Sequence, residues 1–330
     1  MSPLRRLYKR SHRLRRFVRR RKDAFAYHAA RFALWVPRQM SLARALALAD
    51  RIGDLAFALL TETRQRALAH LEMAFGEAMS PSEREKVARA SLRNAARCFV
   101  EVAKFDTIRP QIDAYCSIEG LEHLEQVQAL GRGAIVITGH IGNWELLAGY
   151  FALKGLPISA IARRINDPRL NQLLVDFRAR NGVRSILRES ASSSREILKI
   201  LNARGILALI IDQDMPAPSV SVPFFGRPAR TPAAAAALSL RRNLPVVPVF
   251  AQRRPEGGQR FIIMPPILPS PTGDRQRDII DLTRRFSDVI EERIRMNPAE
   301  WVWWHKRWRR PPVPKLDIDA EMPYSNNVLR

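Results

Sequence analysis

Cysteine is scarce in this chain of 330 residues, and Cys98 and Cys116 are the only two. Two widely spaced thiols are too few for a disulfide scaffold or a structural zinc site, and neither belongs to a C-x-x-C pair. We therefore expect both to be small buried residues in a protein of a reducing compartment.

A long uninterrupted apolar run is also missing. The most apolar segment, residues 42–60, contains Arg44, Asp50, Arg51 and Asp54, each costly at the centre of a bilayer. We expect no membrane-spanning helix here. The segment suits an amphipathic helix packed on the protein, which we favour, or a helix lying at the headgroup boundary of an anionic membrane. The N-terminus shows no secretory signal.

Acidic residues are few relative to basic ones, since 55 Lys and Arg face 32 Asp and Glu and leave a net charge of +23. Residues 1–22 contribute +11 of this and contain no acid. Such a balance is typical of proteins that bind nucleic acid, an anionic membrane surface or phosphorylated substrates. A hydrophobic fraction of 46% excludes disorder throughout the chain.

The hydrophobic pattern changes along the chain. Residues 24–105 predict several helices, one of them capped by Ser80 and opened by Pro81. Short apolar runs then alternate with helical intervals, which predicts an α/β fold with a mainly parallel central sheet covered by helices on both faces. The predicted strands are 133–138, 158–162, 206–211 and 246–250, and the predicted helices are 144–154, 168–180, 194–203, 232–242 and 276–296.

This pattern predicts three parts of the chain. Residues 1–22 form a basic arm, residues 23–312 form a single domain, and residues 313–330 form a polar tail. Within the domain we expect a helical part over residues 23–105 and an α/β core over residues 106–312. Function is expected to reside in the core.

The segment GHIGNWE, residues 139–145, follows the predicted strand 133–138 directly. Ligands of open α/β sheets bind beyond the carboxyl ends of strands, so His140 stands where chemistry is usually sited. His140 is also the only one of six histidines with an acid five residues later. The alternative is a turn whose histidine merely bonds the backbone.

This segment resembles the His-x4-acid motif of the lysophospholipid acyltransferase superfamily, in particular the late acyltransferases of lipid A biosynthesis. The resemblance runs from about residue 60 to 312. Further segments agree with the family in order: ARRINDP (162–168), FRARNG (177–182), DQD (212–214), VPFFG (222–226), PAEW (298–301) and WHKR (304–307).

The resemblance implies transfer of a fatty acyl chain from an acyl carrier protein or coenzyme A thioester to a hydroxyl of a glycolipid. It places the enzyme on the cytoplasmic face of the inner membrane, peripheral or monotopic, with no metal or redox cofactor. His140 would be the general base. Glu145 is the usual motif partner that orients the imidazole, and Asp212 at the end of the strand 206–211 is the second candidate.

Four further residues are candidates for substrate binding. Arg163 and Arg164 follow a predicted strand, and one of them is expected to hold a phosphate of the acceptor or of the donor's phosphopantetheine arm. Asn143 lies within the motif. Asp214 fits a substrate contact and a turn or cap equally well.

Aromatic residues near the site allow two interpretations each. Phe224 and Phe225 suit an acyl-chain channel or ordinary core packing. The tryptophans of residues 301–308, interleaved with basic residues, suit a membrane interface or a substrate rim.

Two alternatives to a lipid A acyltransferase stay open at this stage. The acceptor could be another membrane lipid: a glycerophospholipid, a phosphoinositide mannoside or an amino-acid lipid. Outside the enzymes, the charge suits a nucleic-acid-binding protein, but that leaves the turn at His140 unexplained and no binding motif supports it. The expected partners are thus an anionic membrane surface, the thioester donor and the glycolipid, without nucleic acid.

Overall fold

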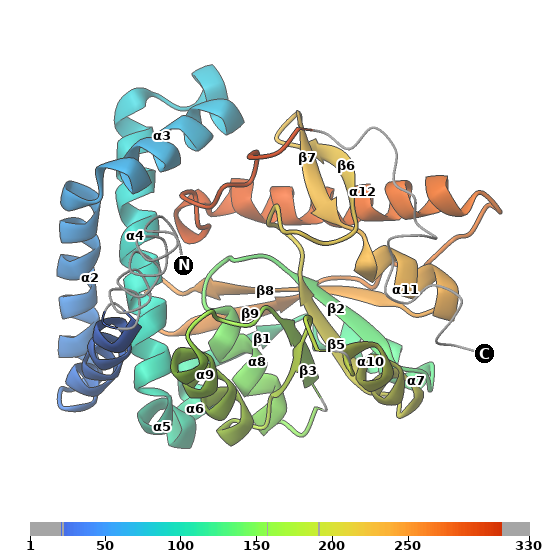
Figure 1. Ribbon diagram of the computed structural model, residues 1–330, viewed down its shortest axis with the longest axis horizontal. Helices are drawn as coiled ribbons and strands as arrows, with labels where there is room; N and C mark the ends of the chain where they lie inside the picture. The colour runs from blue at the N-terminus through green and yellow to red at the C-terminus, as the bar shows by residue number, and fades with distance from the viewer. Residues whose placement is uncertain (1–20, 22, 157, 191, 312–330) are drawn as a thin grey trace, which may run out of the picture.

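The computed structural model describes residues 21, 23–156, 158–190 and 192–311 (Figure 1). The predicted basic arm therefore lies almost entirely outside the described residues, and the predicted tail 313–330 lies wholly outside them. The division of the chain into these parts stays a prediction.

The N-terminal part is helical, as predicted. A helix over 23–38 precedes α2 (Leu42–Leu59), α3 (Thr61–Phe75) and the long α4 (Pro81–Ala103). Ser80 caps α4 in a capping box with Glu83, which explains why that helix begins where it does. The short helices α5 (Phe105–Ile108) and α6 (Ile112–Tyr115) lead from α4 into the sheet.

Helix α2 lies along α4 (Figure 1), and the charges that interrupt its apolar run explain the pairing. Asp50 and Asp54 of α2 each receive two hydrogen bonds from a guanidinium of α4, at 2.5 Å from Arg97 and 2.7 Å from Arg93. Gly53 permits this approach, because a Cβ there would lie 2.5 Å from the Cα of Arg93. The favoured interpretation, a helix packed on the protein, is confirmed.

The outer side of α2 stays apolar. Ile52, Leu55 and Leu59 are 50%, 57% and 66% exposed, and their spacing places them on one stripe of the helix. None of the helices in the described part of the chain is long and apolar enough to span a membrane.

The core of the molecule is a seven-stranded sheet in the order β1-β9-β8-β2-β5-β3-β4. Neighbouring strands run parallel except for β8 and β9, so the predicted mainly parallel sheet is confirmed. The strands are β1 (Cys116–Glu119), β2 (Ala134–Thr138), β3 (Ile158–Ala162), β4 (Arg184–Leu187), β5 (Ile206–Ile210), β8 (Val246–Arg253) and β9 (Gln259–Ile263).

Helices cover both faces of this sheet, because the central strands are apolar on both sides. In β2, Ile135 and Ile137 belong to one hydrophobic cluster, whereas Ala134 and Val136 belong to another. The helices of the core are α7 (Leu121–Ala129), α8 (Trp144–Leu153), α9 (Pro168–Arg180), α10 (Ser193–Asn202), α11 (Ala234–Arg242) and α12 (Arg275–Met296).

The structure shows where the rings of two aromatic segments lie, and for Phe224 and Phe225 it selects core packing from the two interpretations left open. The VPFFG segment belongs to a separate antiparallel hairpin, β6 (Ser219–Phe224) and β7 (Arg227–Pro232). Phe224 and Phe225 are buried against the rings of Trp301 and Trp303, which are themselves 0% exposed. These four rings are core, so they form neither a channel nor a membrane interface.

Candidate active site

Two neighbouring strand ends form the centre of the candidate site. Strands β2 and β5 pair in parallel and end at Thr138 and Ile210, so the residues that follow them emerge at the same edge of the sheet. His140 and Asp212 meet there, with 2.7 Å between His140 Nδ1 and Asp212 Oδ1. The sheet topology itself thus brings the two side chains together.

Asp212 is fully buried and accepts three hydrogen bonds. Its Oδ1 accepts from the His140 ring, and its Oδ2 accepts from the backbone N–H of His140 at 2.6 Å and from Trp301 Nε1 at 2.8 Å. Burial alone would raise the pKa of Asp212, but the charge of His140 and these hydrogen bonds outweigh burial and hold it well below its usual range. A carboxylate so held orients the ring and stabilises its cation.

The His140 ring is thereby prepared to accept a proton. Because Nδ1 carries the hydrogen given to Asp212, the lone pair of the neutral ring is on Nε2. The rings of Trp144 and His305 pack edge-on against it, with centroids 4.7 and 4.9 Å away. The His140 side chain is 16% exposed and lines an open groove.

Gly142 holds the turn that carries His140 close to strand β8. Gly142 has φ +56°, and a Cβ there would lie 2.3 Å from the carbonyl oxygen of Ala251 in β8. Its N–H donates to the carbonyl of Glu300 at 3.2 Å. Only glycine fits this position without strain.

Asn143, a sequence candidate for substrate binding, lines the groove beside His140 and also makes structural contacts, so substrate binding by Asn143 stays a prediction. Its Oδ1 caps α8 by accepting from the N–H of Leu146, and its amide donates to Glu101 Oε2 at 2.8 Å and to the Cys98 carbonyl. Asn143 is 1% exposed, so these contacts use its hydrogen-bonding capacity. A polar loop residue looks the same in sequence whether it caps a helix or holds a ligand.

The Glu101 carboxylate anchors this turn to the helical part. It is 0% exposed and bridges α4 to β8 through Arg253 Nη1 at 2.7 Å, with Tyr115 Oη donating at 2.6 Å. Burial would raise the pKa of Glu101, but the charge of Arg253 and the hydrogen bonds lower it overall. The site therefore rests on a buried, charged junction between the two parts of the chain.

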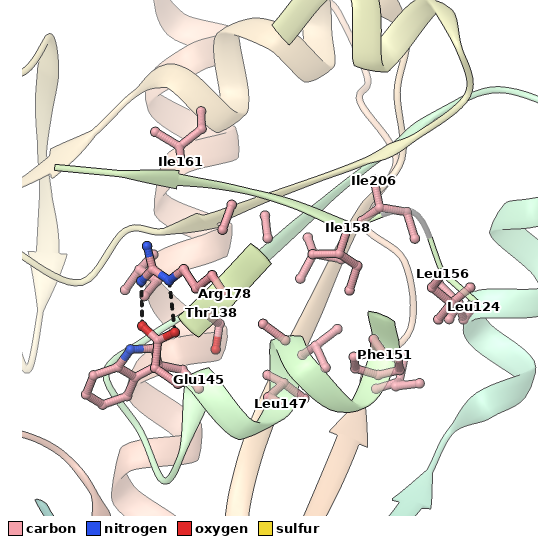
Figure 2. Close-up of a pocket in the computed structure, with 18 residues that line it drawn as sticks. Leu124, Thr138, Glu145, Leu147, Phe151, Leu156, Ile158, Ile161, Arg178 and Ile206 are labelled. Atoms are coloured by element: carbon pink, nitrogen blue, oxygen red, sulfur yellow. Dashed lines mark hydrogen bonds and ion pairs between the residues drawn. The ribbon is translucent and has the colours of Figure 1, made fainter. Parts of the chain in front are cut away.

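Glu145, the favoured partner of His140 in the sequence, does not hold the ring. Its two oxygens accept from Arg178 of α9, at 2.9 Å from Nε and 2.5 Å from Nη2 (Figure 2). Helix α8 begins at Trp144, and its first turn directs Glu145 toward α9, whereas the His140 ring points toward the end of β5. The order of the two candidates is corrected: Asp212 is the partner.

An apolar cavity extends from this ion pair beneath the sheet. Glu145, Arg178 and Thr138 lie at one end of the lining drawn in Figure 2, and Leu124 and Leu156 lie at the other. Between them the walls are mainly aliphatic and aromatic. They include Val136, Leu147, Phe151, Ile158, Ile206, Ile210 and Val249.

A larger groove opens on the other side of the ion pair. Its volume is about 840 Å³, within the usual range for ligand sites of roughly 300–1,000 Å³. His140, His305, Trp144 and Glu145 line it together with parts of the helix over 23–38, α4 and α9. Trp144 and Glu145 line both spaces and thus lie where the groove and the apolar cavity adjoin.

The other predicted binding residues lie apart from this groove. Arg163 and Arg164 are exposed beyond β3 and line neither space, and the backbone N–H of Arg164 donates to Glu189. Phosphate binding by these arginines stays a prediction. Asp214 is buried in an ion pair with Arg310, which gives it a structural role.

Three residues, Trp301, Gln213 and His305, belong to the site, although the sequence pointed to their segments without marking these residues as site candidates. Trp301 donates to Asp212, and the Gln213 amide lies between the rings of His140 and His305. Gln213 could have been noticed as the central residue of the DQD segment. Within the described residues, no group of three or more His, Cys, Asp or Glu side chains is arranged to hold a metal ion.

The chain is similar in sequence to known acyltransferases. The chain is 26% identical to a lipid A biosynthesis lauroyltransferase of Escherichia coli, over 84% of this chain and 90% of that protein. It is 26% identical to a phosphatidylinositol mannoside acyltransferase of Mycobacterium tuberculosis, over 66% and 69%. A solved 1-acyl-sn-glycerophosphate acyltransferase of Thermotoga maritima aligns with 73% of this chain and 98% of its own, at 15% identity and a TM-score of 0.33.

The family of bacterial lipid A biosynthesis acyltransferases matches residues 17–310, a range that includes the described sheet and both residues of the His140–Asp212 pair. The chain therefore belongs to this family and is an acyltransferase that acts on a lipid.

Proposed function

We propose that the enzyme transfers a fatty acyl chain from a thioester, carried by acyl carrier protein or coenzyme A, to a hydroxyl of a lipid A-type glycolipid. The observation that carries this proposal is the imidazole of His140, oriented by Asp212 and open to a groove that adjoins an apolar cavity. A base, an acceptor space and an apolar chain space thus meet at one point.

The chemistry follows from the lone pair on His140 Nε2. This nitrogen takes the proton of the acceptor hydroxyl while the hydroxyl oxygen attacks the thioester carbonyl, whose π electrons move to its oxygen. The intermediate then collapses, the carbonyl re-forms, and the thiolate leaves with the proton from His140. The products are the ester and the free thiol of the carrier.

Each of the two spaces suits one substrate. The cavity beneath the sheet is lined mainly by apolar side chains but is narrow, with a volume of about 60 Å³, so it suits a few methylenes of the donor's acyl chain, with the thioester near Glu145 and Trp144. The groove is wider and bordered by the partly exposed Trp35 and Phe99, so it suits the lipid acceptor. This arrangement presents the reacting carbon to His140 between them.

The exposed apolar side chains indicate how the enzyme reaches its acceptor. The stripe of Ile52, Leu55 and Leu59 on α2 is accompanied by Phe32 and Trp35 of the helix over 23–38, which are 63% and 55% exposed. Apolar side chains beside arginines favour the surface of an anionic membrane. We accordingly place the enzyme at the cytoplasmic face of the inner membrane, without a spanning helix among the described residues.

A second acceptor is supported by one of the comparisons. The relative from Mycobacterium tuberculosis is named for acyl transfer to a phosphatidylinositol mannoside, at the same 26% identity as the lauroyltransferase. The acceptor would then be a mannosylated phospholipid, attacked by the same His140 chemistry.

The proposal is tested by mass spectrometry of acceptor lipids. Purified enzyme, given acyl carrier protein or coenzyme A thioesters, is expected to add one acyl mass to a lipid A precursor with a free hydroxyl. A precursor without free hydroxyls should gain no mass. Mass gain only on the mannosylated phospholipid would select the second acceptor, and gain on neither lipid would contradict both.

The assigned acyl cavity predicts an effect on chain length. Leu124→Phe at the far end of the cavity should shorten the preferred acyl chain. Each methylene that no longer fits forfeits about 0.8 kcal/mol, so a donor two carbons too long should lose roughly 15-fold in kcat/KM. Competition between donors of different length measures the shift.

The matched control for this prediction is Leu121→Phe on the same helix, whose side chain is 44% exposed and outside the cavity. The control should keep the wild-type preference. An unchanged preference in Leu124→Phe itself would contradict the assignment of this cavity to the acyl chain.

A further inference from the structure

His305 lies beside the proposed base without a part in the chemistry described so far. It follows the short helix η3 (Pro298–Glu300), and an antiparallel bridge between Ile141 and Trp301 brings this segment to the turn of His140. The rings of His305 and His140 meet edge-on, with centroids 4.9 Å apart at 84°. His305 is partly buried and lines the groove.

The Gln213 amide defines which nitrogen of His305 carries the hydrogen. Gln213 Nε2 lies 3.2 Å from Nδ1 and 3.1 Å from Nε2 of His140, and it lies 2.6 Å from Nδ1 and 3.2 Å from Nε2 of His305. An amide nitrogen can only donate, and its shortest contact in each ring makes His140 Nε2 and His305 Nδ1 the acceptors. For His140 this agrees with the hydrogen that Nδ1 gives to Asp212. For His305 it leaves the hydrogen of the neutral ring on Nε2. The acceptor hydroxyl takes the place of Gln213 at His140 Nε2 when the substrate binds.

The neutral form of His305 is favoured by its surroundings. Burial, and to a smaller extent the charge of His140, lowers the pKa of His305 to about 4. At neutral pH the ring therefore presents one N–H donor and no charge. Within the described part of the chain, nothing accepts a hydrogen bond from His305 Nε2, although this nitrogen lies next to the reacting centre.

The reaction needs a donor of this kind. As the thioester is attacked, negative charge develops on its carbonyl oxygen, and a fixed N–H aimed at that oxygen stabilises the transition state. Two nearby backbone amides are already committed, because His140 N–H donates to Asp212 and Gly142 N–H donates to Glu300. These two amides are not free to bind the thioester oxygen, and His305 is placed to supply a side-chain donor on this side of the base.

We propose that His305 is a further catalytic residue, whose Nε2–H donates a hydrogen bond to the thioester oxygen as it becomes negative. This inference rests on the proposed function and deepens it. His305 keeps its proton throughout, while His140 alone takes the hydroxyl proton and passes it to the thiolate. Gln213 is a positioning residue, since its hydrogen bond to Nδ1 keeps the hydrogen of His305 on Nε2.

Three variants of His305 test this role. His305→Phe keeps a flat ring but removes the donor, and it should lower kcat about 10²–10³-fold with the donor KM changed less than about threefold. His305→Gln carries an amide nitrogen near the position of Nε2 and should recover at least about tenfold of that loss. His305→Asn carries its amide near Nδ1 and should recover little.

The control is His123→Phe on α7, a histidine outside both the groove and the cavity, which should keep wild-type kcat. Thermal unfolding of each variant reports folding. A purely structural role for His305 predicts that Phe, which preserves the ring contact, is the best tolerated of the three. Should His305→Phe fail to fold, the difference between Gln and Asn still decides.

The outcomes separate this inference from the proposed function. An active wild-type enzyme with kcat unchanged in His305→Phe, or equal losses in Gln and Asn, would overturn the role of His305 alone. A wild-type enzyme that forms no ester with any donor and acceptor would overturn the proposed function and this inference together. Selective rescue by Gln supports both.

Discussion

Replacement of His140 by alanine is expected to lower kcat for acyl transfer about 10²–10⁴-fold, the usual contribution of a general base. A hydroxyl is a poor nucleophile, and its proton must leave as the thioester is attacked. The Nε2 lone pair of His140, oriented through Nδ1 by Asp212, meets this need at the groove. Transfer of radiolabelled acyl groups to the lipid acceptor measures the loss.

The substitution of His140 should impair the chemical step and leave membrane binding unchanged. His140 is not part of the exposed apolar stripe on α2, so His140→Ala should bind anionic vesicles as the wild type does. The matched control His123→Ala removes an imidazole from α7 and should keep full activity. Full turnover by His140→Ala would disprove its role as the base.

Replacement of Asp212 by asparagine is expected to cost about as much, because an amide in place of an orienting carboxylate lowers kcat on the order of 10⁴-fold in a catalytic triad. Three N–H groups point at the Asp212 carboxylate, and an asparagine amide cannot accept them all. The His140 ring would lose its oriented tautomer and the charge that stabilises its cation. Steady-state kinetics measures the fall in kcat.

Glu145→Gln is the comparison that decides between the two acids. In the wild type the Glu145 carboxylate pairs with Arg178 and not with His140, so the kcat of Glu145→Gln should fall less than about tenfold. The ¹⁵N shifts of the His140 ring should change in Asp212→Asn and stay unchanged in Glu145→Gln. A larger loss of kcat in Glu145→Gln than in Asp212→Asn would restore Glu145 as the orienting residue.

The fold could be predicted where strands are buried on both faces. The strands β2, β3, β5 and β8 are mainly apolar, and each overlaps a predicted strand, although β8 continues to Arg253 beyond the predicted end at residue 250. Strand β1 carries the polar Ser117 and Glu119, and the apolar part of β9 is limited to its end after Gln259 and Arg260, so neither strand was predicted. Their pairing depends on contacts between distant segments that local patterns do not encode.

The site could be predicted in part from the positions at which two strands end. The rule that ligands bind at strand ends located His140 and Asp212, because it depends only on where two strands stop. The ranking of Glu145 over Asp212 failed because the motif spacing says nothing about the direction of the side chain once α8 begins at Trp144. His305 was missed because only the bridge between Ile141 and Trp301 brings it to the base.

Asp212 accepts hydrogen bonds from both the ring and the backbone of His140, and this links catalysis to the integrity of the sheet. The carboxylate holds both the ring and the main chain of the histidine, and it follows directly after β5. The imidazole cannot swing away by a simple rotamer change without giving up a hydrogen bond to a fully buried anion. Heating should therefore inactivate this enzyme when strands β2 and β5 separate. Loss of activity and thermal unfolding should then occur in a single cooperative transition.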